Sequence, residues 1–140
     1  MHHALSHINW LAVLLAAVVN MVLGGLWYSP VLFANAWMRE NNLTEEAIRA
    51  RGKEANRGYI IASVGSLVAA LILALLAEHF PLDGPVHGAL LGLLVGIGGV
   101  ATAVAAHYAF EGRSMRLYAI NVGYSVVGMM LMGAIIGAWR

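Results

Sequence analysis

The chain has 140 residues, of which 61% are hydrophobic and 11% are charged, with a net charge of +1 and no cysteine. About a quarter of the residues in a soluble domain are charged, and a small soluble domain cannot bury so much apolar surface, so the composition favours an integral membrane protein. It excludes disulfide bonds, thiolate metal sites and cysteine nucleophiles, and no basic tract suggests a nucleic acid partner.

Four apolar segments are long enough to cross a bilayer as helices. A span needs about 20 apolar residues, and the segments 8–28, 59–79, 86–108 and 117–139 meet this length. Their apolar positions are continuous, whereas those of a half-buried strand alternate. We therefore predict one transmembrane domain over 1–140, an all-α integral membrane four-helix bundle. The last two connections are short, which favours up-down topology.

The connection over 29–58 is the longest of the three. Pro30 ends the first span, because it removes a backbone donor and keeps the preceding residue out of the helix. Further on, Thr44 is a typical helix cap, two glutamates follow it in the first turn, and Gly52 suits the end of a helix. We predict a short cytoplasmic amphipathic helix here.

Basic residues give the orientation. Of the eight Lys and Arg residues, five lie within 29–58, two lie within 111–116, and Arg140 is the last. By the positive-inside rule, both basic loops are cytoplasmic and both termini lie outside, in a multi-pass protein of the cell membrane. The lipid bilayer is then the first expected partner.

Small residues at four-residue spacing mark two of the spans. The third span carries Gly88, Gly92 and Gly96, and the second carries Gly58, Ala62, Ser66 and Ala70. In lipid, helices associate through close approach at such residues, so we expect the second and third spans to form a tight pair. The fourth span has small residues on two faces. One face is predicted to serve the bundle and the other a second copy, which would give a homodimer.

Polar and aromatic residues suggest a ligand site in a cytoplasm-facing polar layer. The candidates are Asn20, Trp27, Tyr28, His107, Glu111, Arg113, Asn121 and Tyr124. At 1.5 Å per residue these side chains have similar depths, with Asn20 deeper, and a helical wheel places His107 within about 20° of Gly96. Polar groups inside a membrane often mark binding sites or pathways, but they also hold helices together by hydrogen bonds alone.

The charged candidates suggest further roles. His107 and Glu111 share a helix face, which would suit proton transfer. Glu111 and Arg113 could bind a charged headgroup or substrate, or could form a local ion pair.

Metal and cofactor chemistry are not predicted. Five histidines gather at the predicted outer side, namely His2, His3, His7, His79 and His87. Imidazoles suit divalent metals, but two of these residues belong to the terminus and few carboxylates are near, so we predict no metal site and no haem. No nucleophile elbow, phosphate loop or metalloprotease motif is present, so no catalytic residues are assigned and an enzyme is the weakest class.

Several motifs together resemble one known family. The segments LWYSP, FEGRSMRLYAINVGY and MGAIIGAW make the chain similar to the domain-of-unknown-function family 1761, small four-helix membrane proteins of bacteria and some fungi. The resemblance implies four helices and membrane residence without supplying an activity. The shared pattern includes Trp27, Tyr28, Pro30, Glu111, Gly112 and Arg113. Many members carry a histidine after the Gly-Tyr pair, where this chain has Ser125.

Two functions of different classes follow from these patterns. The leading hypothesis is a non-enzymatic membrane protein whose cytoplasm-facing polar layer binds or passes a small ligand. The alternative is a structural or partner-binding membrane subunit, whose loop 29–58 would contact a protein not identified by the sequence.

Overall fold

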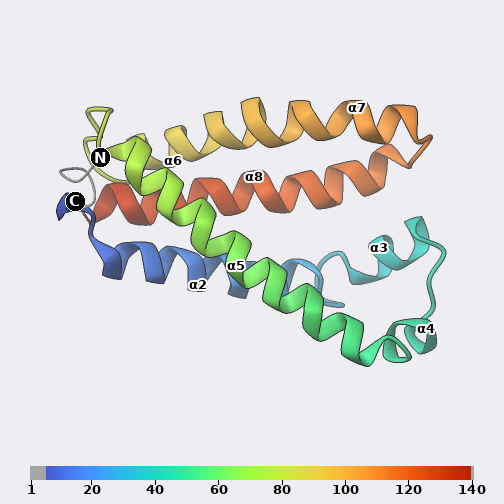
Figure 1. Ribbon diagram of the computed structural model, residues 1–140. Helices are drawn as coiled ribbons and strands as arrows, with labels where there is room; N and C mark the ends of the chain where they lie inside the picture. Colours follow the sequence, from blue (N-terminus) through green and yellow to red (C-terminus); the bar gives the residue numbers. More distant parts are fainter. Residues whose placement is uncertain (1–5, 140) are drawn as a thin grey trace.

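The computed structural model describes residues 6–139, and Figure 1 shows them as a bundle of long helices. The beginning of α2 (Trp10–Trp27), the end of α8 (Met115–Ala138) and the turn that follows α5 (Gly52–Ala77) lie together. We call this the terminal end. The other two connections lie at the opposite end, which we call the loop end (Figure 1).

The described residues form helices and turns, with four helices long and apolar enough to cross a membrane. These are α2, α5, the continuous helical segment Pro85–Phe110, and α8. The prediction of an all-α membrane protein with four spans is thereby confirmed. One boundary differs, because α5 begins at Gly52 and takes in the last residues of the predicted loop. Glu54 occupies its first turn, where the helix dipole favours an acidic side chain.

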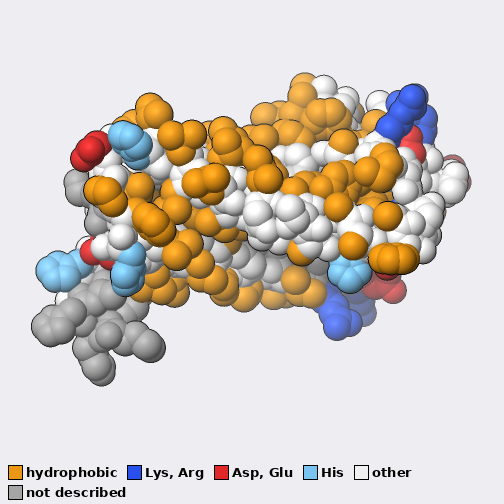
Figure 2. All heavy atoms as spheres, turned by 90° about the horizontal axis from the view of Figure 1, so that it is seen from above, with side chains coloured by type: hydrophobic (Ala, Val, Ile, Leu, Met, Phe, Trp, Pro, Cys, Tyr) orange, Lys and Arg blue, Asp and Glu red, His pale blue; other side chains and the backbone are white. Residues whose placement is uncertain are grey.

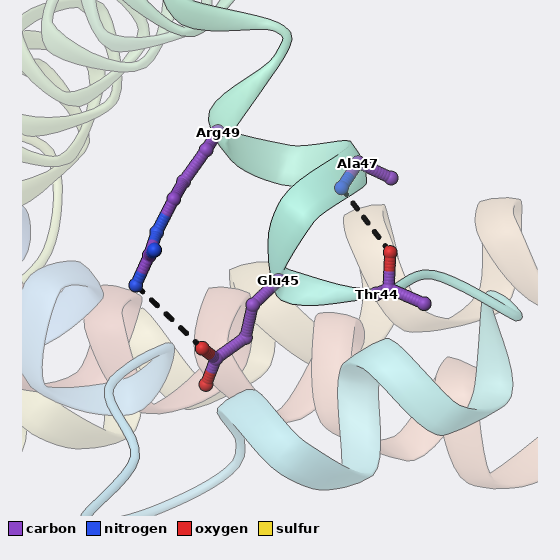
Figure 3. A network of polar contacts seen from close by, with 4 residues as sticks. All are labelled: Thr44, Glu45, Ala47 and Arg49. Atoms are coloured by element: carbon purple, nitrogen blue, oxygen red, sulfur yellow. Dashed lines mark hydrogen bonds and ion pairs between the residues drawn. The ribbon is translucent and has the colours of Figure 1, made fainter.

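Two short helices lie between the first two spans. They are α3 (Ala34–Glu40) and α4 (Glu45–Arg49). Thr44 caps α4, because its hydroxyl accepts a hydrogen bond from the Ala47 amide at 3.2 Å. Glu45 and Arg49 form an ion pair at 3.7 Å along the same helix (Figure 3). The helix predicted after Thr44 is therefore present.

The central helix is α8, which packs most extensively against α6 (Pro85–Val95) and next against α2. A Cβ on Gly88 would overlap the carbonyl oxygen of Gly133, and one on Gly92 would overlap that of Met129. The expected tight pairing of the second and third spans is therefore wrong. The glycines of α6 face α8, and contact between α5 and α6 is sparse.

Both faces of α8 that carry small residues are occupied within the chain. Gly133 faces α6, and Gly128 faces Asn20 of α2. The face that was expected to bind a second copy is therefore covered. The homodimer stays a prediction, and it would have to use another surface.

A π-helical segment, η1 (Gly96–Ala101), interrupts the third span between α6 and α7 (Thr102–Phe110). Two backbone oxygens of this segment accept hydrogen bonds from side-chain hydroxyls. The Thr102 hydroxyl donates to the Gly98 oxygen at 2.6 Å, and the Tyr118 hydroxyl donates to the Ala101 oxygen at 2.7 Å. In lipid, backbone groups that leave the regular ladder need such partners.

The π segment changes which side of α7 faces the bundle. Three α-helical turns cover about 11 residues, which would place His107 in line with Gly96. A π turn holds one residue more and rotates everything after it by about 100°. Tyr108 is therefore buried, and His107 lies on the exposed face.

The two halves of α5 differ in packing. Toward the terminal end, Ala70, Leu73 and Ala74 are buried in the apolar core with residues of α2 and α8. Toward the loop end, every residue from 52 to 62 is exposed, and α5 leans away from α2 and α8 (Figure 1). Figure 2 shows a broad apolar surface between the two ends, with blue basic side chains at the loop end.

Candidate functional site

A chain of side-chain hydrogen bonds connects three helices near the loop end. The Tyr28 hydroxyl, just after α2, donates to Asn121 Oδ1 of α8 at 2.8 Å. The other end of that amide, Nδ2, donates to the Tyr108 hydroxyl of α7 at 2.8 Å. Asn121 is therefore held on both sides by tyrosines from different helices.

Aromatic packing fixes the end of α2 beside this chain. The indole nitrogen of Trp27 donates to the backbone oxygen of Ile120 at 2.9 Å. Its ring lies 4.8 Å from that of Phe33, and the Tyr28 ring meets the Tyr124 ring edge-on at 5.6 Å. These contacts follow from the turn after α2, which brings Phe33 back so that its amide bonds to the Trp27 oxygen.

A second polar contact lies deeper in the bundle. Asn20 is 8% exposed, and its Nδ2 donates to the Ser66 hydroxyl of α5 at 2.9 Å. The Tyr124 hydroxyl donates to the backbone oxygen of Asn20 at 3.2 Å. The remaining amide atom, Asn20 Oδ1, accepts no hydrogen bond and lies against Gly128. A glycine is needed there, because a Cβ would overlap that oxygen.

These two groups of contacts form what we call the polar layer. It consists of Asn20, Tyr28, Ser66, Tyr108, Asn121 and Tyr124. Four of the eight candidates identified by sequence, Asn20, Tyr28, Asn121 and Tyr124, belong to it, and Trp27 packs against it.

The other three candidates lie outside the polar layer. His107 is on the exposed face of α7, so the expectation that it joins the layer is wrong. The π-helical segment before α7 rotates this helix by about 100° and turns His107 away from the bundle. Glu111 and Arg113 lie exposed in the turn before α8, 4.0 Å apart. The Arg113 guanidinium also lies over the Tyr108 ring, 4.4 Å from its centroid, which connects this turn to the layer.

Sequence reasoning missed Tyr108 and Ser66 as members of the site. Tyr108 was not among the candidates, because on a regular helix His107, and not Tyr108, lies in line with Gly96. Ser66 was counted as a small packing residue of the second span. Its hydroxyl could have been paired with Asn20 beforehand, because both lie at similar depths in adjacent spans.

The layer offers uncharged hydrogen-bonding groups. Hydroxyls and amides can orient a polar ligand, and the aromatic rings beside them supply flat apolar walls. Tyr28, Asn121 and Tyr124 are partly exposed, whereas Tyr108 and Ser66 are buried. The arrangement therefore suits binding better than acid–base chemistry.

Within residues 6–139, no group of three or more His, Asp or Glu side chains is placed to hold a metal ion. His7, His79 and His87 are exposed, and the rings of the last two contact backbone oxygens of their own chain segments. His2 and His3 lie outside the described residues.

Comparisons with known proteins give one finding. The model of a family described as "Protein of unknown function (DUF1761)" matches residues 11–137. Comparisons with curated proteins and with solved structures gave no match. The family match covers the four spans, apart from Trp10 and Ala138, and the three connections between them, and the chain therefore belongs to the DUF1761 family of proteins of unknown function.

Proposed function

We propose that this protein is a non-enzymatic, multi-pass protein of the cell membrane that binds or passes a small polar ligand at the polar layer. The observation that carries the proposal is the Tyr28–Asn121–Tyr108 chain, where three helices converge on one partly exposed amide. Intramembrane polar groups are expensive, and those that line an accessible space tend to serve a ligand.

The way α5 leans supports access from the loop end. Beyond Ser66 toward the loop end, α5 leaves the bundle, and every residue from 52 to 62 is exposed. We place the loop end in the cytoplasm and the termini outside, since the described Lys and Arg residues lie in the connections and at the starts of α5 and α8 at that end.

The test is a thermal-stability screen of the detergent-purified protein against small polar solutes, including amino acids, polyols and nucleobases. A solute at about 100 times its Kd stabilises a protein by about 2.7 kcal/mol, which shifts the Tm by several degrees. We expect a shift in the wild type, its loss in Asn121→Leu, and its retention in His107→Gln, because His107 lies off the layer.

The opposite pattern would contradict the proposal. If no solute shifts the Tm, or if the shift survives in both Asn121→Leu and the double variant Tyr28→Phe with Tyr108→Phe, then the layer only holds the helices together. The unliganded Tm of each variant, recorded in the same screen, separates a lost ligand from a lost fold.

A second candidate function is partner binding by the loop end. Every residue from 49 to 62 is exposed, and the segment carries charges of both signs. The test is photo-crosslinking in cells from position 55, compared with the variant in which a Gly-Ser linker replaces 44–52. A specific crosslinked partner that disappears in the linker variant would favour this function over the first.

A further inference from the structure

The hydrogen bonds of the polar layer leave two hydrogens unused. Asn121 Oδ1 accepts from the Tyr28 hydroxyl, and Asn121 Nδ2 donates to the Tyr108 hydroxyl, each at 2.8 Å. Because Tyr108 is the acceptor in its bond, its own hydroxyl hydrogen stays available, and so does the second hydrogen on Asn121 Nδ2. The hydrogen bonds within residues 6–139 include no acceptor for either of them.

Burial makes the spare hydrogen of Tyr108 the more costly of the two. Tyr108 is 6% exposed, whereas Asn121 and Tyr28 are partly exposed. A lone pair left unfilled in a protein interior is common, but a buried donor without an acceptor is rare, because it has lost its bond to water and gained none. The Tyr108 hydroxyl therefore calls for an acceptor that the described residues do not supply.

Aromatic rings surround the partly exposed side of this group. The rings of Tyr28 and Tyr124 meet edge-on at 5.6 Å, and the ring of Trp27 lies 6.5 Å from that of Tyr124. All three residues are partly exposed. Such faces suit a ligand with a flat, apolar body, and the hydroxyl hydrogen then fixes the direction of its polar end.

The charges beside the layer do not favour an anion. The Arg113 guanidinium lies 4.4 Å from the centroid of the Tyr108 ring, but the Glu111 carboxylate lies 4.0 Å from that same guanidinium. Its charge is thus already accompanied by an opposite one. An anion bound between helices without a counter-charge of its own would lose more on leaving water than it gains. An uncharged acceptor avoids this loss.

We propose that the ligand of the polar layer is an uncharged carbonyl compound with a flat apolar body. Its oxygen accepts the spare hydrogen of Tyr108, and its body lies against the rings of Tyr28, Tyr124 and Trp27. A ketone or another carbonyl compound fits, because it accepts hydrogen bonds and need not donate any. This inference rests on the function proposed above for the layer and names the ligand class of that site.

The experiment uses the full chain in lipid nanodiscs, with binding measured by calorimetry and corrected with empty nanodiscs. The probes are acetophenone, α-methylstyrene and benzoate. α-Methylstyrene has the shape of acetophenone with a CH₂ group in place of the carbonyl oxygen, and benzoate carries a charge. We expect acetophenone to bind at least tenfold more tightly than either of the other two.

A second measurement follows the hydroxyl itself. In protein labelled with ¹³C at the tyrosine Cζ position, the Tyr108 resonance is identified from its loss in Tyr108→Phe. Acetophenone should shift this resonance, because the Cζ atom carries the hydroxyl that forms the new bond, and α-methylstyrene should leave it in place. This measurement on the wild type does not depend on whether any variant folds.

Tyr108→Phe removes the hydroxyl and keeps the ring, and it should weaken acetophenone binding at least tenfold. Tyr59→Phe is the matched control. It removes the same group from a side chain that is 72% exposed and outside the layer, so affinity should stay within twofold of the wild type. The Tm of each variant shows whether it folds.

Three results would overturn the inference. They are equal affinity for acetophenone and α-methylstyrene, tighter binding of benzoate than of acetophenone, and an unmoved Tyr108 resonance. The first is also the result expected if the hydroxyl bonds only to water. If no probe binds while a polyol or an amino acid shifts the Tm in the screen described above, this inference fails and the proposed function stands. If neither set of compounds binds, both fail.

Discussion

The two ends of the α2–α5–α8 interface are built differently. Toward the terminal end the helices touch through small apolar side chains, and Ala16 and Ala70 are both 0% exposed. Toward the loop end α5 leaves the bundle, and amides and hydroxyls connect the helices that remain. The contact between Asn20 and Ser66 marks the change from one kind of association to the other.

The difference teaches how a short chain holds helices together in lipid. Lipid tails are as apolar as leucine, so no hydrophobic force drives one helix onto another. Close packing of small residues and interhelical hydrogen bonds are then the available sources of stability. This protein uses close packing where the helices are close and hydrogen bonds where they diverge, with the glycine contact between α6 and α8 as its tightest packing.

The largest expected effect comes from breaking close packing. In Gly92→Ala, the new Cβ would overlap the carbonyl of Met129, so α6 and α8 must separate, and we expect a loss of about 2 kcal/mol in the free energy of unfolding. Gly65→Ala is the control, because its Cβ meets no atom within 4 Å; a helix gains up to about 1 kcal/mol from this change. Unfolding in mixed micelles measures both, and equal stabilities would contradict the packing account.

A smaller effect should come from removing the hydrogen bond between Asn20 and Ser66, which lies between the closely packed region and the hydrogen-bonded region. Ser66→Ala leaves Asn20 Nδ2 buried without its acceptor, and we expect a loss of about 1 kcal/mol, in the range found for polar contacts between membrane helices. In Ser63→Ala the lost hydroxyl bonds only to the Tyr59 oxygen of its own helix, so stability should barely change. A Ser66→Ala variant as stable as the Ser63→Ala variant would argue that this contact contributes little.

The smallest effect is expected from deleting one residue of the π segment. Deletion of Gly99 should let the third span run as a regular α-helix while Tyr108 stays in line with Gly96, so stability should stay within about 1 kcal/mol. A double-mutant cycle between Tyr108 and Asn121 should give the same coupling with and without the deletion. Deletion of Ala89 is the control, because it disrupts the spacing of Gly88 and Gly92 and should destabilise strongly; if deletion of Gly99 removes the coupling, the register argument is wrong.

Part of the candidate site could be predicted from sequence. Asn20 and Asn121 were identified because a polar side chain inside an apolar run stands out whatever its partners are. Ser66 was seen only as a small residue, and the inward position of Tyr108 was not seen. Both depend on a neighbour: Ser66 on the amide that faces it from α2, and Tyr108 on the register of its own helix.

The sequence by itself determined the four spans, the short helix after Thr44 and the clustering of basic residues in two of the connections. These are local properties of length, apolarity, capping and charge, and they survive any arrangement of the helices. Only the tertiary structure decided that the glycines of α6 face α8, that α5 leans away at the loop end, and that Tyr108 replaces His107 on the inward face. The reason is that helix pairing depends on residues far apart in the chain, and one extra residue in a turn rotates a whole helix face by about 100°.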